Sequence, residues 1–295
     1  MISQNYANLE NAETREIVSP VNEIYLSNED IESFGDLVGD HSRIHRSTKA
    51  AKEKGFDDTP VMGVHLAAIG GKLSRGLLEI IRQNNPEMKF VGQRVIFKNP
   101  VYPGRKRWPK WEFEGIKISR EGIITPTITA KRDGEINVEI QSRFSNEIPT
   151  PRSHNNDQFL YAQDVEIKPK EIRSFYEQLK ENPNDRKMAF SHGVSLIPST
   201  LLSFLGEVNQ LHGKQTVGMN REMNSEFYGE VAPENSRIEI YEKSSRIKPD
   251  RGLFVYTFDS VLSQQGTPKV SSRIKCVTTG DVPIRSLREK FGYAY

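Results

Sequence analysis

Short sequence features recur along this chain at a nearly constant offset, in the same order and in elements of the same kind. Gly63 matches Gly193 and Val101-Tyr-Pro103 matches Val231-Ala-Pro233, both at an offset of 130 in the numbering, and Gly134 matches Gly266 at an offset of 132. A fixed period of this kind is the sequence signature of a repeated structural unit. We therefore predict two copies of one fold, and this duplication limits the architectures open to the chain more than any other feature.

Each copy combines a long apolar helix with a series of strands. In the first copy, apolar residues from Gly63 to about Arg82 cover most of the helical circumference, which predicts a helix buried on several sides. The period then changes to two, which predicts strands over 93–101, 111–118, 123–130 and 135–144, with a hairpin turn at Arg132-Asp-Gly134. The second copy repeats this order, with a helix from Gly193 through Leu205, strands at 238–240, 253–262 and 270–277, and a turn at Gln265-Gly266. One helix followed by antiparallel strands predicts an α+β fold in which the sheet wraps the helix.

The two copies differ just before the long helix. Ser27 and Asp30 have the form of a capping box, and a short helix follows that ends at Gly39. Matching its apolar residues Ile31 and Phe34 with Ile172 and Phe175 gives an offset of 141, so the second copy is eleven residues shorter before Gly193. The missing stretch is the one in which the first copy carries Asp40 and His45. Only the first copy is expected to have this acid and imidazole pair.

The domain boundaries follow from the repeat and from a polar, proline-containing stretch at 149–157. A short strand is predicted at Glu23–Leu26, where ordered structure is expected to begin. We predict an N-terminal lead-in at 1–22, a domain with the acid and imidazole pair at 23–148, a linker at 149–160, a degenerate second domain at 161–280 and a C-terminal tail at 281–295.

The charge balance and the cysteine count of the chain exclude several classes of function and partner. The 41 Lys and Arg residues nearly balance the 39 Asp and Glu residues, so neither nucleic acid nor an anionic membrane is an expected partner. A single cysteine, Cys276, cannot form an internal disulfide, which fits a reducing compartment, and a cytoplasmic location is expected. Residues 1–20 lack the apolar run of a signal peptide or anchor, and the longest apolar stretches are interrupted by charged residues.

The segment from Phe34 to Gly63 resembles the signature of the MaoC-like (R)-specific enoyl-thioester hydratases and 3-hydroxyacyl-thioester dehydratases. The resemblance is carried by Gly39-Asp40, His45, Gly55-Phe56 and Gly63, and by the later segment from Phe97 through Pro100-Val101 to Pro103-Gly104. In that family an Asp and a His five residues apart are followed by a glycine at the head of the central helix. Ser191-His192-Gly193 is similar to the same motif more weakly. The resemblance covers most of residues 23–280 and implies a double hotdog, in which two long helices are each wrapped by a curved antiparallel sheet.

The resemblance implies a hydro-lyase that adds water to a 2-enoyl thioester or removes it from a 3-hydroxyacyl thioester. Asp40 and His45 on one loop are expected to hold a water and share its proton transfers, a contribution of roughly 10² to 10⁴ in rate. The backbone N–H of Gly63, at a helix N-terminus, is expected to donate to the thioester oxygen. The implied substrate is an acyl-CoA or acyl carrier protein thioester, and no cofactor or metal is expected.

Further residues are assigned to substrate binding. Met62 and His65 flank Gly63 and are candidates to line the site, whereas Arg105, Lys106 and Arg107 are candidates to contact carrier phosphates. A core position for Met62 and a solvated hairpin for the basic stretch are the alternative interpretations. His192 is interpreted as a relic of the ancestral site, and His212 as a cap near the end of the second helix.

The sequence also departs from the family pattern. Ser42-Arg43 replaces the usual Asn-Pro, Ser47 stands where the family often has Asp, and Met62 replaces the His before Gly63. These departures keep open a non-catalytic acyl-thioester binding protein as one alternative. A hotdog thioesterase is a second, enzymatic alternative. A thioesterase is expected to carry an acidic residue on the early turns of the central helix, and residues 64–74 contain none. The second copy is expected to act as an internal partner for the first, and assembly into a homodimer is left open.

Overall fold

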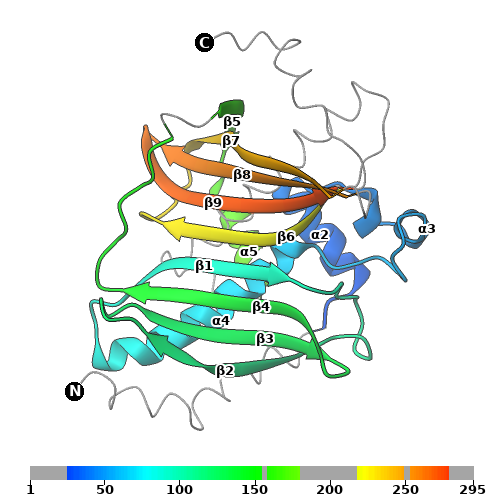
Figure 1. The fold of residues 1–295 in the computed structure, drawn as a ribbon, viewed down its shortest axis with the longest axis horizontal. Coiled ribbons are helices and arrows are strands. Elements are labelled where there is room, and N and C mark those ends of the chain that lie inside the picture. Colours follow the sequence, from blue (N-terminus) through cyan, green and yellow to red (C-terminus); the bar gives the residue numbers. More distant parts are fainter. Residues whose placement is uncertain (1–24, 155–157, 180–217, 249–252, 279–295) are drawn as a thin grey trace.

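The protein has an α+β architecture in which one long helix lies against an extended antiparallel sheet (Figure 1). The computed structural model describes residues 25–154, 158–179, 218–248 and 253–278. In chain order the elements are α2 (Asn28–Val38), η2 (Arg43–His45), α3 (Thr48–Lys52), α4 (Gly63–Asn84), β1 (Lys89–Phe97), β2 (Lys110–Ile118), β3 (Ile124–Arg132), β4 (Glu135–Ser145), β5 (Gln158–Glu166), α5 (Pro169–Gln178), β6 (Gly218–Phe227), β7 (Asn235–Lys248), β8 (Leu253–Gln264) and β9 (Thr267–Thr278). Within these residues no helix is long and apolar enough to cross a membrane.

The strands of the described residues form one sheet in the order β2-β3-β4-β1-β6-β9-β8-β7-β5. The first four belong to the N-terminal half and the last five to the C-terminal half, and the two halves meet where β1 pairs with β6. Read outward from this junction, the first half runs β1-β4-β3-β2 and the second runs β6-β9-β8-β7. The two halves of the sheet therefore repeat the same strand order, with β5 added at the second edge.

Irregularities in strand pairing also recur between the two halves. Val91 and Arg221, which the repeat matches at an offset of 130, are each the extra residue of a β-bulge, in β1 and β6 respectively. The β3–β4 and β8–β9 hairpins turn at Asp133-Gly134 and Gln265-Gly266, and all four of these residues have positive φ (53° and 82°, 50° and 73°). Such a two-residue turn matches the twist of the flanking strands. Both hairpin turns predicted from the sequence are confirmed.

The helices of the first half begin and end where the sequence predicts. Ser27 caps α2 through a capping box with Asp30, and Gly39 ends the helix with φ of 77°. Helix α4 begins at Gly63 as predicted and lies against β1 and β4. Gly70 lets the helix approach the sheet, because a Cβ at this position would overlap the side chain of Ile140. The apolar residues of α4 and the sheet form one buried core, with fully buried Leu73 and Leu77 on the helix side.

The short helices α2 and α5 pack against each other across the two halves. Phe34 and Phe175, which the repeat matches at an offset of 141, have ring centroids 5.7 Å apart. The Lys72 side chain on α4 donates to the backbone oxygen of Leu179 at 2.7 Å, just after α5. Matched residues of the two halves therefore meet near the junction of the sheet.

Some sequence predictions differ from the observed elements. Strands β5 and β6 were not predicted, and β5 begins at Gln158, inside the range 149–160 assigned to the linker. Tyr25 and Leu26 lie outside any strand, and Leu26 instead accepts a hydrogen bond from the backbone of Gly104 at 3.0 Å. The predicted helix from Gly193 through Leu205, with His192 and His212, lies outside the described residues.

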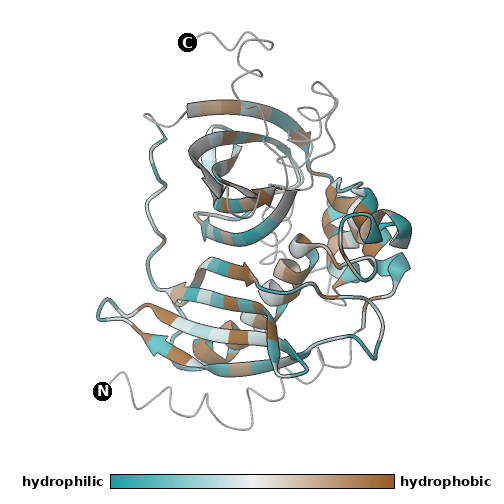
Figure 2. Cartoon of the chain, turned by 45° about the vertical axis from the view of Figure 1, so that its right-hand side comes forward, coloured by the Kyte–Doolittle hydropathy of each residue, from teal (hydrophilic) through white to brown (hydrophobic). Residues whose placement is uncertain are grey.

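Polarity explains why β6 escaped prediction. Its sequence, Gly-Met-Asn-Arg-Glu-Met-Asn-Ser-Glu-Phe, contains few apolar residues, yet β6 is paired on both edges, with β1 and β9. Figure 2 shows polar residues along this strand, in contrast to the mixed colouring of the first half. Backbone pairing on both edges places this strand in the sheet, and Met223 and Phe227 on its inner face are buried in the core.

We predict that the β1–β6 junction will not accept a side chain at Gly92. An added Cβ would lie 2.7 Å from the backbone oxygen of Ser225 and would overlap the guanidinium of Arg143. Gly92→Ala should lower the free energy of unfolding by ~1–3 kcal/mol, because a backbone atom cannot move aside as a flexible side chain does. Urea unfolding measures this change.

Gly229→Ala is the matched control, since an added Cβ there meets only the Lys269 side chain, at 3.5 Å. Equal free energies of unfolding for Gly92→Ala and Gly229→Ala would contradict the close approach of β1 and β6 at Gly92.

Candidate active site

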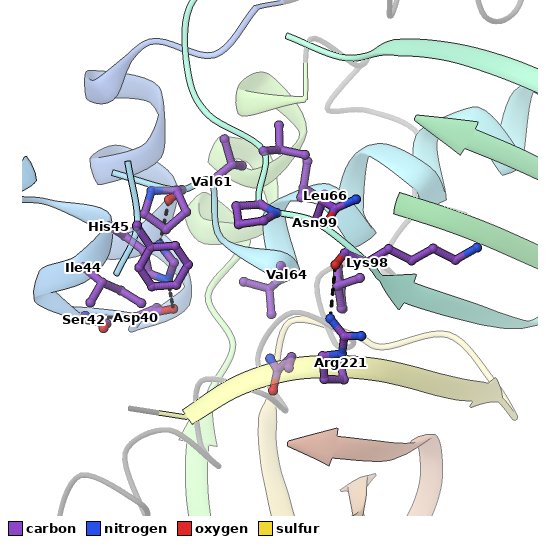
Figure 3. Close-up of a pocket in the computed structure, with 17 residues that line it drawn as sticks. Asp40, Ser42, Ile44, His45, Val61, Val64, Leu66, Lys98, Asn99 and Arg221 are labelled. Atoms are coloured by element: carbon purple, nitrogen blue, oxygen red, sulfur yellow. Dashed lines mark hydrogen bonds and ion pairs between the residues drawn. The ribbon is translucent and has the colours of Figure 1, made fainter. Parts of the chain in front are cut away.

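A cavity of about 150 Å³ lies where the loop after α2, the start of α4, the end of β1 and strand β6 meet (Figure 3). Its walls are largely apolar, with polar groups on two sides. The lining residues are Asp40, Ser42, Ile44, His45, Phe56, Pro60, Val61, Gly63, Val64, Leu66, Phe97, Lys98, Asn99, Pro100, Val101, Asn220 and Arg221. The cavity thus brings together Asp40, His45 and Gly63, the three residues predicted to carry the chemistry.

Asp40 is held by the tight end of α2. Its backbone N–H donates to Gly35 at 2.8 Å, and its Oδ1 accepts from the backbone N–H of Ser42 at 3.0 Å. The side chain is only 3% exposed. Arg46 Nη2 donates to the carbonyl oxygen of Asp40 at 3.3 Å and to Asp36 at 2.6 Å, which ties the turn to the segment that follows it. Among the described residues, Asp40 is therefore a buried acidic side chain with Oδ1 hydrogen-bonded and Oδ2 available.

His45 ends the short 3-10 turn η2 and is oriented by the segment that precedes α4. Its Nδ1 lies 2.7 Å from the carbonyl oxygen of Pro60. Because a carbonyl oxygen can only accept, Nδ1 carries the hydrogen, and neutral His45 presents an unprotonated Nε2. This Nε2 faces Asp40 Oδ2 across 4.0 Å.

The separation of His45 Nε2 and Asp40 Oδ2 suits a molecule placed between them. A distance of 4.0 Å is too long for a direct hydrogen bond, whereas a water contacting both groups is a common arrangement. Such a water would donate one hydrogen to Nε2 and one to the carboxylate. The pair can thus orient a water and accept one of its protons.

Gly63 contributes the N-terminus of α4 to the same cavity. Within the described residues nothing accepts a hydrogen bond from its backbone N–H, whereas the N–H groups of His65 and Leu66 donate to Met62. A Cβ at Gly63 would lie 3.2 Å from the Phe97 ring, so glycine leaves room on the cavity wall. Val61 is anchored to the opposite segment, its N–H donating to Val101 at 2.7 Å. The free N–H at a helix start can stabilise a negative oxygen.

Met62 and His65, assigned to substrate binding from the sequence, do not line the cavity. Both side chains are fully buried, and Met62 belongs to the apolar core beneath α2. The ring of His65 stacks on Phe34 with centroids 3.9 Å apart. Burial lowers the pKa of His65 from 6.5 to about 3, so the ring is neutral at neutral pH. Their role in substrate binding is therefore not supported by their position.

The basic stretch also lies outside the cavity lining. Arg107 forms an ion pair with Asp58 at 2.7 Å, and Arg105 lies over the Tyr25 ring at 5.3 Å. A hydrogen bond from Thr48 and the contact with Arg107 lower the pKa of Asp58 to about 2, so this ion pair persists at neutral pH. Lys106 is exposed. Arg105 and Arg107 thus have local structural partners, and phosphate binding by Arg105, Lys106 and Arg107 stays a prediction.

Two of the residues that depart from the family pattern have defined local roles. The Ser42 backbone N–H binds Asp40, and Ser47 caps α3 by accepting from Ala50 N–H at 3.3 Å. Arg43 is exposed. The departures therefore leave the loop that carries Asp40 and His45 folded around the cavity.

Sequence reasoning missed the cavity wall formed by Lys98, Asn99, Asn220 and Arg221. Lys98 and Asn99 fall within a predicted strand that in fact ends at Phe97, so they lie in the loop that follows. Asn220 and Arg221 come from β6, far away in the chain, and no motif marks them. Only the pairing of β6 with β1 brings them to the site.

Comparisons of the structure define the class of fold. A putative MaoC domain protein dehydratase from Chloroflexus aurantiacus J-10-fl is similar over 88% of this chain and 93% of its own, with 12% identity and a TM-score of 0.60. A MaoC-like dehydratase from Phytophthora capsici covers 87% and 93%, with 12% identity and a TM-score of 0.52. The acyl-CoA thioesterase II TesB2 from Mycobacterium marinum covers 76% and 92%, with 11% identity and a TM-score of 0.51. At these identities the likeness establishes a hotdog-like fold and does not choose between the reactions.

The sequence comparison is more specific for the N-terminal part. Residues 10–132 match the family described as MaoC like domain, so this part of the chain is similar to that family. The match includes Asp40, His45 and Gly63. A search of curated protein sequences finds no match.

We predict that buried His65 makes the protein less stable in acid. Its folded pKa of about 3 is below the unfolded value of 6.5, so between these values the unfolded chain binds the proton more readily. The penalty is absent above pH 6.5 and grows by ~1.4 kcal/mol per pH unit below it. His65→Phe keeps the ring stack and removes the titrating group.

Urea unfolding of both proteins across this pH range measures the difference. Relative to the unaltered chain, the free energy of unfolding of His65→Phe should rise by ~2 kcal/mol between about pH 7 and about pH 5. Stability curves that stay parallel over this range would show that His65 is not held neutral by burial.

Proposed function

We propose that this chain is a hydro-lyase that reversibly adds water to a 2-enoyl thioester, or removes it from a 3-hydroxyacyl thioester. The observation that carries the proposal is the Asp40–His45 pair on one cavity wall, with Nε2 and Oδ2 4.0 Å apart and Nδ1 held by Pro60. The MaoC-like domain over residues 10–132 supports the same reaction.

In the hydration direction the water between the pair is the reactant. His45 Nε2 accepts one proton as the water oxygen bonds to C3 of the enoyl group, and Asp40 holds the other hydrogen and stabilises the resulting imidazolium. The electron pair of the double bond moves toward the thioester carbonyl, whose oxygen accepts from Gly63 N–H. His45 then returns the proton to C2, so one water is consumed and both side chains regain their starting states.

The surroundings of the pair favour this chemistry. Asp40 is 3% exposed and the His45 side chain 12% exposed, so bulk water competes little with the bound one. Interactions between charges and dipoles are stronger in such a partly dry site than at the surface. Apolar residues such as Val61, Val64 and Phe97 provide a wall suited to an acyl chain.

The thioesterase alternative has less support from the central helix. Helix α4 has no acidic residue in its first turn, and Glu79, which comes late, is exposed. The fold itself accommodates both reactions, since a thioesterase is among the similar structures. Product analysis therefore has to separate the two reactions.

We predict that hydration depends on Asp40 and His45. Asp40→Asn and His45→Ala should each lower the rate with crotonyl-CoA by about 10² to 10⁴, because each removes one of the two contacts to the reacting water. Loss of enoyl absorbance measures hydration, and a thiol reagent measures CoA release. CoA release without hydration would indicate a thioesterase, and binding without turnover would indicate a binding protein.

The chain contains a matched control pair. Asp36 and His41 are also five residues apart and form a 3.4 Å contact, but both are exposed and neither lines the cavity. Asp36→Asn and His41→Ala should leave the rate within about threefold of the unaltered chain, since neither group reaches the substrate. A loss as large as that of the Asp40 and His45 variants would contradict the assignment.

We further propose that the chain is a double hotdog with a degenerate second copy. The repeated strand order, the matched bulges at Val91 and Arg221 and the pairing of Arg94 with Asn224, also at an offset of 130, support two copies related by a pseudo-twofold axis. The first copy would span 23–148 and the second 161–280. The second copy stands in for one subunit of a homodimer and leaves room for a larger acyl chain.

A fragment comprising residues 1–157 tests this proposal. Without β6 the edge of β1 is left unpaired, and an unpaired edge of this length pairs with other chains. The fragment should be insoluble or self-associate, as measured by size-exclusion chromatography with light scattering against the full chain. A stable, active monomer would rule the proposal out.

The acyl group of the proposed substrate is carried by CoA or by an acyl carrier protein. We place the activity in the cytoplasm on the ground of the single cysteine. The reaction as written requires no cofactor, because water and the two side chains supply every proton.

A further inference from the structure

Arg221 is placed at the cavity by a β-bulge of the second half. In the β6–β9 pairing, Asn220 lies opposite Cys276 and Glu222 opposite Lys275, so Arg221 is the extra residue. The matching bulge in β1 carries Val91, which is buried. Bulges redirect side chains and are frequent beside active sites. The same irregularity thus places an apolar side chain in the core of one half and an arginine at the site in the other.

The guanidinium of Arg221 is oriented toward the first half. Its Nη1 donates to the backbone oxygen of Lys98 at 3.1 Å, across the β1–β6 junction. Figure 3 shows Arg221 and Lys98 on one side of the cavity and Asp40 and His45 on the other, with Val64 between them. A single hydrogen bond uses one of five guanidinium N–H donors. Within the part of the chain that the structure describes, the remaining donors are available to a ligand.

Charge distinguishes Arg221 from the other cation of the cavity. Lys98 forms an ion pair with Glu139 at 2.9 Å, whereas no carboxylate of the described residues lies within ion-pair distance of Arg221. Its neighbour Glu222 is bound to Arg94 at 2.7 Å. Among the described residues, nothing therefore compensates the positive charge that Arg221 brings to the wall opposite the catalytic pair.

Asn220 adds a second polar group to this wall. Its Oδ1 accepts from Cys276 Sγ at 3.1 Å. Burial raises the pKa of the Cys276 thiol to about 12, so the thiol keeps its proton and can donate. With Oδ1 engaged, the amide NH₂ of Asn220 is the group left for a ligand. Donors and positive charge thus lie together on this side of the cavity.

We propose that Arg221 binds a carboxylate on the acyl part of the substrate, so that this site takes a dicarboxylic acyl thioester. The proposal rests on the proposed function, which places the reacting carbons at Asp40 and His45. The apolar surface between the pair and Arg221 fits a short acyl chain with an acidic end. A carrier phosphate fits less well, because the long pantetheine arm separates it from the thioester. Arginine matches the planar geometry of a carboxylate.

Binding of two saturated thioesters tests the proposal without requiring turnover. Succinyl-CoA and butyryl-CoA have acyl chains of equal length that differ in a terminal carboxylate, and neither can be hydrated. Arg221→Met should weaken the binding of succinyl-CoA about tenfold, as measured by calorimetric titration. The affinity for butyryl-CoA should change less than about twofold, because only succinyl-CoA loses a charged partner. Arg221→Lys should recover part of the loss.

Controls separate the sources of the negative charge. Lys98→Met, on the same wall but already paired with Glu139, should leave the succinyl-to-butyryl ratio unchanged. The Arg221→Met effect should persist with succinyl-pantetheine, which lacks phosphates. Arg221→Met could instead lower the affinity for both CoA thioesters equally and leave the affinity for both pantetheine thioesters unchanged. This result would assign the contact of Arg221 to a carrier phosphate and overturn the proposal.

Other results would also overturn it. These are an unchanged ratio of succinyl-CoA to butyryl-CoA affinity in Arg221→Met, a loss of succinyl-CoA affinity that occurs only in Lys98→Met, and no binding of either thioester. Failure to hydrate any enoyl thioester would instead overturn the proposed function, and the binding ratios would still decide the role of Arg221.

Discussion

The pairing of β1 with β6 is the interaction on which the rest of the structure depends. It joins two half-sheets of the same strand order into one sheet and places Arg94 opposite Asn224, the matching position of the other half. Backbone hydrogen bonds between the strands leave neither half with an exposed edge at the centre. Gly92 allows this close approach, because the Ser225 backbone and the Arg143 side chain occupy the space of a Cβ. A polar network of Arg143, Arg152 and Glu226 lies beside the same junction.

The junction also brings together side chains from both halves in the candidate site. The first half contributes the carboxylate and imidazole through the loop after α2, and the second contributes Asn220 and Arg221 through a bulge in β6. Inside the first half, the bond from His45 Nδ1 to Pro60 sets the tautomer and leaves Nε2 facing Asp40. Orientation of a histidine by a backbone carbonyl is a common device for making the other nitrogen basic. The two sides of the cavity thus differ in chemistry, with the acid and imidazole pair on one and a guanidinium group on the other.

The proposed duplication, followed by divergence of the two copies, accounts for this division of roles. A bulge present in both halves places buried Val91 in one and exposed Arg221 in the other. Once two copies are joined in one chain, residues at matched positions can change independently. Under the proposed duplication, the second half contributes to the site through strand β6 without an acid and imidazole pair of its own.

Local patterns in the sequence were sufficient for much of the fold and for part of the site. The capping box at Ser27, the helix start at Gly63 and the turns at Gly134 and Gly266 depend on residues close in the chain, and all are observed. The family resemblance likewise rests on one continuous segment, so Asp40, His45 and Gly63 are found together. By contrast, Met62 and His65 were assigned to the site from their closeness in sequence to Gly63. Helix geometry turns these side chains into the core instead.

The sequence by itself determined the repeat, the order of the helices and most strands, and the three residues on which the proposed chemistry rests, because each is encoded within a short stretch. The tertiary structure alone decided how the halves meet, that polar β6 is a central strand, and that Arg221 faces the cavity of the other half. These features depend on pairings between residues that lie far apart in the chain, for which a single sequence carries no local signal.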